Sequence, residues 1–392
     1  MRVGINALFN ATGGSLKNLQ QLLLDWKGLV STEHEFVIFA SDSTYEKIKQ
    51  VTGDRYTLIR VKACSNVLTR ILVEQMVLPF LMIKHRIKVL FCPANTIPFF
   101  TNVPCVVTFQ NAAPFCDTLK MKTVGIKQGI QFCLLGIFIR LAARRATHVI
   151  FISHFFRNLL HDRFGFDQSR GSVIYRAKID CPLDEKNSNV LKRYGIEGDF
   201  VFSTSHLISY KNIHELILGY SIAQKEMGTH LPKLYIAGGE YVSGYRAVLQ
   251  SVIDASALRD KVILLGSIPY NDVTALLQRC LYFVFTSTCE NCPTALIEAM
   301  SAGKPIACSD VGVMPEIAGD AACYFDPFEP ASIAKALVEM SNHPEVRQLY
   351  QSRLANELQK IPCRDEIALE TLRVIETAAT TPLYTTAEQQ GR

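Results

Sequence analysis

The stretch LYFVFTSTCENCPTALIEAMSAGKPIACS, residues 281–309, contains the pattern that decides the fold. An apolar run, LYFVFTS, precedes a segment that has Pro293 near its start and a glycine and a proline at its end, and KPIACS follows. Proline suits the first position of a helix, and glycine followed by proline suits its end. The spacing therefore predicts a strand, a helix over about 293–302 with Cys292 near its N-cap, and another strand.

The same alternation runs through the whole chain. The apolar strand-like runs are RVGIN, FVIFA, KVLFC, PCVVTF, HVIFIS and SVIY in the first half, and FVFSTS, KLYIAGG, KVILLG, LYFVFTS and KPIACS in the second. Most are separated by longer segments with helical potential, such as Leu16–Leu29 and Gly129–Ala143. Continuous apolar strands alternating with helices are typical of parallel sheets covered by helices on both faces. The predicted fold class is α/β, with doubly wound sheets.

Three parts of the chain are expected from its length and charge. Residues 1–180 carry 23 Lys and Arg against 11 Asp and Glu, whereas residues 181–392 carry 18 against 25. The charge balance changes sign near 177–199, where few sustained apolar runs occur. We therefore expect one doubly wound domain at 1–180, a second at 181–363, and a helix from 364 that crosses back to the first domain, followed by a flexible tail to 392. Two such domains facing each other would form a cleft.

The composition of the chain limits the cellular compartments in which we expect the protein. The start MRVGINALFNATGG reads as a strand and a loop rather than a secretion signal, and no apolar run reaches the ~20 residues of a membrane-spanning helix. The 12 cysteines show no disulfide-framework spacing. We expect reduced thiols and a cytoplasmic protein.

Residues 75–161 form a basic region. Asp117 is its only acid, against ten lysines and arginines. Such a block favours an anionic partner, whether a membrane, a nucleic acid or an acidic substrate. A helix near 118–145 could lie on an anionic membrane, peripheral to it, or could simply cover the sheet with a basic rim; the pattern leaves both open.

The strand-to-helix turn of 281–309 holds the first candidate site. The backbone N–H groups of Thr294 and Ala295, after Pro293, fall in the first helical turn, where they suit a phosphate. Glu290 lies on the loop, and Glu298, eight residues later, could accept hydrogen bonds from a diol. Two ordinary surface glutamates are the alternative.

Three further loops follow predicted strands. Lys211, in STSHLISYKN with His206, could neutralise a diphosphate, although it could also be a solvated lysine before an ordinary helix. Gly13 and Gly14 would let backbone approach a ligand closely. Gln110 and Asn111 could bind an acceptor or donor hydroxyl, or reflect simple loop polarity.

The cysteines of the first turn form a C-x-x-C motif. One such pair without a second pair or a histidine pair is half a zinc site. We therefore interpret Cys289 and Cys292 as bystanders in a tight turn, with no metal.

Taken together, these motifs resemble a known family. ENCPTALIEAMSAGKPI with GVMPEIAGDAACYFDPFEP resembles the signature of family 4 retaining glycosyltransferases, HLISYKN resembles that family's phosphate loop, and VIFISHFFRNLLHDRFG resembles the end of its first domain. The resemblance implies two Rossmann-like domains of the GT-B kind. It also implies a nucleotide-sugar donor, no metal or other cofactor, and a glycan or lipid-linked glycan acceptor, as in surface polysaccharide assembly.

The resemblance also implies residue roles. Glu298 would bind the donor ribose, Glu290 the donor sugar and Lys211 the diphosphate, while the Gly13-Gly14 loop would close over the phosphates. The chain departs from the family at His206, where an arginine is common, and at Gln110-Asn111, where many members have a histidine. A nucleotide-sugar epimerase, a phosphorylase and a non-enzymatic nucleic-acid-binding protein remain alternatives, although no aromatic-interleaved basic motif favours nucleic acid.

Overall fold

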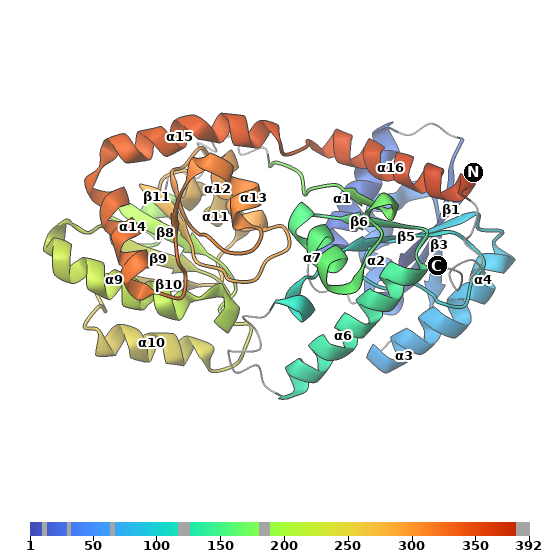
Figure 1. Cartoon of the computed structure of the whole chain (residues 1–392), viewed down its shortest axis with the longest axis horizontal. Helices are drawn as coiled ribbons and strands as arrows, with labels where there is room; N and C mark the ends of the chain where they lie inside the picture. Colours follow the sequence, from blue (N-terminus) through green and yellow to red (C-terminus); the bar gives the residue numbers. More distant parts are fainter. Residues whose placement is uncertain (10–13, 30–32, 63–66, 117–125, 180–188, 382–392) are drawn as a thin grey trace. The chain divides into compact units, whose positions relative to one another are not determined.

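The computed structural model describes residues 1–9, 14–29, 33–62, 67–116, 126–179 and 189–381. Its contacts divide the chain into two compact units (Figure 1). Among the described residues, the first unit contains 1–114, 126–177 and 362–381, and the second contains 115–116, 178–179 and 189–361. The main boundaries therefore fall at 177/178 and 361/362, close to the expected 180/181 and 363/364.

The first unit is a parallel sheet with helices. Its strands are β1 (Arg2–Ala7), β2 (Glu35–Ser41), β3 (Tyr56–Val61), β4 (Val89–Cys92), β5 (Cys105–Phe109), β6 (His148–Phe151) and β7 (Gly171–Val173). Its helices are α1 (Gly14–Leu29), α2 (Asp42–Thr52), α3 (Val67–Leu72), α4 (Leu78–Lys84), α6 (Ile126–Arg145), α7 (His154–Phe164) and α16 (Arg364–Thr380). A π-helical turn, η2 (Val73–Val77), joins α3 to α4.

The strand order of this sheet is β3-β2-β1-β4-β5-β6-β7, with parallel pairing throughout. The order reverses direction between β1 and β4. In a doubly wound sheet a ligand binds at the carboxyl ends of the strands beside such a switch point. Residues that follow β1 and β4 are therefore the ones to consider for binding.

The helix α16 belongs to the first unit although it follows the second in sequence. The indole Nε1 of Trp26, on α1, donates to the carbonyl oxygen of Ala368, on α16, at 2.8 Å. Leu372 and Ile375 join the buried cluster around the first sheet. Helix α16 therefore packs against α1 within the first unit.

The second unit repeats the plan. Its strands are β8 (Phe200–Thr204), β9 (Lys233–Ala237), β10 (Val262–Gly266), β11 (Tyr282–Phe285), β12 (Ile306–Ser309) and β13 (Ala322–Phe325), in the order β10-β9-β8-β11-β12-β13. Its helices are α8 (Val190–Arg193), α9 (Ile213–Met227), α10 (Tyr245–Ala255), α11 (Tyr270–Leu277), α12 (Thr294–Ser301), α13 (Met314–Ala318), α14 (Pro330–Asn342) and α15 (Pro344–Gln359). All its strand pairs are parallel, and its switch point lies between β8 and β11.

The predicted α/β class with two doubly wound parallel sheets is confirmed. Two edge strands, β3 and β13, escaped the sequence analysis. Strand β3 has exposed and half-exposed residues between its buried ends, so it lacks the continuous apolar run of an inner strand. Within the described ranges, no helix is long and apolar enough to cross a membrane.

Candidate active site

The switch point of the second unit brings together the loops that the sequence singled out. The β8–α9 loop carries His206 and Lys211, and the β11–α12 loop carries Glu290. These two strands are neighbours in a parallel sheet, so their loops leave the same edge side by side.

Lys211 and Glu290 form an ion pair. The Lys211 Nζ donates to the Glu290 Oε1, and each side chain is only about 15% exposed, at 14 and 15%. The ammonium also lies over the rings of Tyr210 and Phe285, at 5.4 and 5.7 Å from the ring centroids. Cation–π contacts add to the attraction of a partly desolvated ammonium. Lys211 is thus a positioned charge rather than the solvated lysine of the alternative interpretation.

Hydrogen bonds to backbone carbonyl oxygens hold the two loops together. The Thr286 hydroxyl donates to the Lys211 carbonyl oxygen at 2.8 Å, and the Thr288 N–H donates to the Tyr210 carbonyl oxygen at 2.8 Å. Asn212 follows in the left-handed region, with φ of 62°, and its buried side-chain amide donates to the Pro327 carbonyl oxygen. Asparagine tolerates this conformation better than most residues. The backbone therefore sets the position of the ion pair.

Helix α12 begins at Thr294, with Pro293 at its N-cap, one residue later than predicted. The N–H groups of Thr294 and Ala295 belong to its first turn, as expected, and Thr294 is exposed. Glu298 lies one turn further along. Its Oε1 accepts a hydrogen bond from the Tyr270 hydroxyl at 2.9 Å. Tyr270, the first residue of α11, is a neighbour of the site that no sequence pattern indicated.

The β9–α10 loop forms a third side of the site. Leu207 N–H donates to the Gly239 carbonyl oxygen at 2.9 Å, and the exposed His206 ring lies 6.0 Å from that of Tyr241. At Gly238, where φ is 155°, an added Cβ would lie 1.6 Å from the Ser205 carbonyl oxygen. Only glycine permits such an approach. Sequence analysis missed this glycine, although the GG pair after KLYIA is a visible signal of close backbone contact.

The expectation that all the cysteines are reduced is wrong for two of them. Cys289, immediately before Glu290, forms a disulfide with Cys116, which lies 173 residues earlier in the chain and belongs to the same unit. The other cysteine of the motif, Cys292, is buried and takes no part in that disulfide. The C-x-x-C spacing therefore does not mark a pair. The disulfide ties the loop that bears Glu290 to a distant segment.

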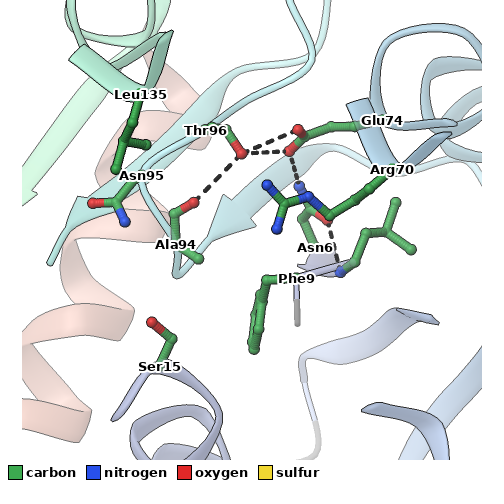
Figure 2. Close-up of a pocket in the computed structure, with 10 residues that line it drawn as sticks. Asn6, Phe9, Ser15, Arg70, Glu74, Ala94, Asn95, Thr96 and Leu135 are labelled. Carbon is green, nitrogen blue, oxygen red and sulfur yellow. Dashed lines mark hydrogen bonds between the residues drawn. The ribbon is translucent and has the colours of Figure 1, made fainter. Parts of the chain in front are cut away.

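The switch point of the first unit holds a cavity of about 220 Å³. Figure 2 shows its lining, which comes from the ends of β1 and β4 and from α1, α3, η2 and α6. Those residues are Asn6, Leu8, Phe9, Ser15, Arg70, Glu74, Ala94, Asn95, Thr96 and Leu135. A mixture of amides, a hydroxyl, a guanidinium and an aromatic ring suits a polyhydroxylated ligand.

Glu74 is the buried acid of this cavity. The Asn6 side-chain amide donates to its Oε1 at 2.6 Å, and the Thr96 hydroxyl lies 2.9 and 3.0 Å from its two oxygens (Figure 2). Burial raises the pKa of the Glu74 carboxyl, and the two hydrogen bonds and the Arg70 charge oppose that rise. Glu74 sits on η2, and π-helical turns often occur at functional sites.

Gln110 and Asn111 stand next to this cavity without lining it. The Gln110 Oε1 accepts hydrogen bonds from Ser15 Oγ at 3.1 Å and from Asn18 Nδ2 at 3.3 Å. The Asn111 Oδ1 accepts from the Ala113 N–H at 2.9 Å. Both side chains therefore stabilise the loops around the cavity. Gly14 begins α1, and Gly13 lies outside the described residues.

The two switch points supply complementary chemistry. The second unit offers a lysine, a helix N-terminus and two carboxylates, a set that suits a diphosphate attached to a hydroxylated group. The first offers a polar cavity. Among the residues that the structure describes, no cluster of three His, Cys, Asp or Glu side chains could hold a metal.

Known proteins resemble this chain in sequence. Residues 189–355 match the family model described as Glycosyl transferases group 1. The O-antigen chain mannosyltransferase RfbU of Salmonella typhimurium is 24% identical over 277 residues, 70% of this chain and 71% of that protein. The O-antigen chain mannosyltransferase B of Escherichia coli is 25% identical over 219 residues, 53% of this chain and 55% of that protein. These relatives give no support to an epimerase, a phosphorylase or a nucleic-acid-binding protein.

Solved structures share the fold. A glycosyltransferase from Rickettsia africae has a TM-score of 0.72 at 12% identity, covering 97% of this chain and 99% of that one. The Anabaena protein HepE, solved in complex with UDP and glucose, has a TM-score of 0.71 at 17% identity, covering 96 and 100%. At such identities the likeness concerns the fold, and the GT-B architecture expected from the sequence is confirmed.

Substitution of Gly238 tests the close approach of the β9–α10 loop. Gly238→Ala should lower the free energy of unfolding by at least ~1–3 kcal/mol, because the methyl group meets the Ser205 carbonyl oxygen and the backbone conformation disfavours L residues. Gly239→Ala is the matched control, since its Cβ would lie an ordinary 3.6 Å from Ser267 Cβ. Urea unfolding followed by circular dichroism compares them, and equal midpoints would contradict this account.

The buried carboxyl of Glu74 should make stability depend on pH. Its raised pKa means that the folded chain holds a proton that the unfolded chain loses near the usual value of 4.5. Its contribution to stability is therefore complete below that pH and is lost as the pH rises through the folded-state pKa. Glu74→Gln stays neutral, so the unfolding free energy of the wild type should fall relative to this variant from about pH 4.5 upward. Parallel curves for the two proteins would contradict the prediction.

Proposed function

We propose that this chain is a retaining, metal-independent hexosyltransferase, because residues 189–355 match the family model described as Glycosyl transferases group 1. It takes a sugar from a nucleotide-sugar donor and transfers it to a glycan or lipid-linked glycan in cell-surface polysaccharide assembly. The observation that carries the proposal is the Lys211–Glu290 pair at the switch point of the second unit, beside the first turn of α12.

The donor diphosphate is bound by cationic and backbone groups of the second unit. Lys211 and the N–H groups of Thr294 and Ala295 offset the charge that develops on the leaving phosphate, with the exposed His206 at the rim. Preorganised donors aimed at developing charge are usually the largest source of rate enhancement. This set needs no metal or other cofactor, because the protein itself supplies the compensating charge.

The two glutamates orient the donor's hydroxyl groups. Glu290 accepts hydrogen bonds from the transferred sugar, since it lies beside the ammonium that meets the phosphate. Glu298, one turn beyond the first turn of α12, accepts hydrogen bonds from the ribose hydroxyls. The Tyr270 hydroxyl donates to the Glu298 carboxylate and so holds it in place. The Gly13-Gly14 loop completes the donor site in this proposal, as in the family that the sequence resembles.

The reaction exchanges one bond at the anomeric carbon. The bond from this carbon to the phosphate oxygen breaks while the bond to the acceptor oxygen forms on the same face, and the acceptor proton passes to the leaving phosphate. No side chain then forms a covalent intermediate. The acceptor occupies the cavity of the first unit, where Asn6, Glu74 and Asn95 bind its hydroxyls and Gln110 and Asn111 support the loops.

We further propose a cytoplasmic location with peripheral attachment to the inner face of the membrane. The basic region 75–161 supports this, because each lysine or arginine near an anionic bilayer contributes about 1 kcal/mol.

Donor binding tests the site directly. A thermal-shift panel of nucleotide sugars should begin with activated mannose and glucose, because the relatives are named mannosyltransferases and HepE was solved with UDP-glucose. Lys211→Ala and Glu298→Ala should abolish the shift, and Lys211→Ala should lower the transfer rate by roughly 10²–10³. Lys225→Ala, an exposed lysine on α9, should leave both unchanged. Normal shifts in both site variants would refute the donor site.

The stereochemistry of the product tests the reaction. Because departure and attack use the same face, the product should have the anomeric configuration of the donor. Proton NMR of the glycosidic bond measures this, and an inverted product would exclude the proposed step while leaving the donor site intact.

A further inference from the structure

The segment α3–η2–α4 of the first unit carries large apolar side chains on its solvent side. Leu72, Met76, Phe80 and Ile83 are between 63 and 74% exposed. They recur at separations of three or four residues, which puts them along one side of a helix. Contiguous exposed apolar side chains often mark a surface that binds a protein or a membrane, whereas single exposed apolar residues are ordinary.

A second apolar row lies on α6. Ile130, Leu134, Ile137 and Leu141 are between 40 and 57% exposed and again recur at separations of three or four residues. Their neighbours on the helix, Ile139 and Ala142, are fully buried. This helix therefore has one apolar side that is buried and another that faces solvent.

The chain between β4 and β5 links the two rows. The Gln75 side chain, on η2, donates to the Ile97 carbonyl oxygen at 2.9 Å and accepts from the Phe99 N–H at 2.7 Å. The Phe99 ring in turn stacks on Phe138 of α6, with 6.1 Å between the ring centroids. Phe100 follows and is 74% exposed.

Basic side chains follow both rows in the sequence. Lys84, Arg86 and Lys88 at the end of α4 are exposed, and so are Arg144 and Arg145 at the end of α6. Over the described residues 67–116 and 126–157, the single acid is Glu74, which is buried. Apolar side chains bordered by lysine and arginine without exposed acids complement a lipid surface with anionic headgroups.

We propose that the two rows and Phe100, together the apolar face, insert into the headgroup region of an anionic phospholipid bilayer. Arg70 and Glu74 on α3–η2 and Leu135 on α6 line the cavity, so the segments that meet the bilayer also border the proposed acceptor site (Figure 2). A membrane-borne acceptor would then reach the cavity from the lipid. This access route for the acceptor rests on the proposed function. Insertion of the apolar face into the bilayer does not, because it requires no glycosyl transfer.

Vesicle sedimentation tests the inference with the whole chain of 392 residues. The wild type should bind phosphatidylcholine vesicles that contain phosphatidylglycerol, and binding should persist in part at about 1 M NaCl, where surface charges are screened within ~3 Å. Met76→Asp combined with Phe80→Asp should weaken binding to the vesicles roughly tenfold or more. The reason is that two apolar side chains are no longer transferred from water into the lipid. Leu349→Asp, on α15 of the second unit, is the matched control at 47% exposure and should bind as the wild type does.

A fluorescent reporter gives a second measurement that does not depend on charge. The chain has one tryptophan, Trp26, which is fully buried. Phe80→Trp should therefore add an exposed emission that shifts to shorter wavelength when anionic vesicles are added. No shift, or equal vesicle binding by the paired aspartate variant and the wild type, would overturn the inference.

Two other outcomes would also overturn it. Binding that disappears completely at high salt would leave only the basic region in contact with lipid. Self-association that the paired aspartate variant abolishes, without vesicle binding, would assign the apolar face to a second copy of the chain. The thermal shift with nucleotide sugars is measured without lipid, so failure of the donor site and failure of the apolar face are distinguishable.

Discussion

Parallel pairing of the strands brings the carboxyl ends of all strands in a sheet to one edge, and the strands of both described sheets pair in parallel. At the reversal of strand order, two adjacent loops diverge and leave room between them. In the first unit this happens at β1 and β4, where Asn6 and Asn95 line the cavity. In the second it happens at β8 and β11, where Lys211 meets Glu290. The two sites are consequences of one topology used twice.

The pairing of Lys211 with Glu290 explains why a charged site is stable in partly buried surroundings. A lone ammonium at this depth would lose hydration without compensation, whereas the carboxylate, the two aromatic rings and the fixed backbone around it replace the lost water. A sugar diphosphate offers hydroxyls to the one partner and phosphate oxygens to the other. The proposed donor can therefore separate the pair while leaving neither charge exposed to an apolar environment.

Sequence reasoning went furthest where the signal is local. The alternation of apolar runs predicted the fold, and the motif around Glu290 and Glu298 resembled a glycosyltransferase family, in line with the match of residues 189–355 to the model described as Glycosyl transferases group 1. It failed for the edge strands β3 and β13, whose residues are partly exposed or few. It also missed Glu74, Tyr270 and the partner of Cys289, because these depend on contacts between segments far apart in sequence. A single acid on a helix looks ordinary until topology places Asn6 and Thr96 around it.

The position of α16 has a consequence for how the molecule is made. The first unit contains residues on both sides of 178–361, so the larger part of the second unit is inserted into the sequence of the first. A ribosome that works from the N-terminus releases all of 178–361 before it releases the helix that covers Trp26. Since domains fold as units, the second can complete its core during synthesis while the first, although begun earlier, waits for its final helix. The order of folding is then the reverse of the order of translation.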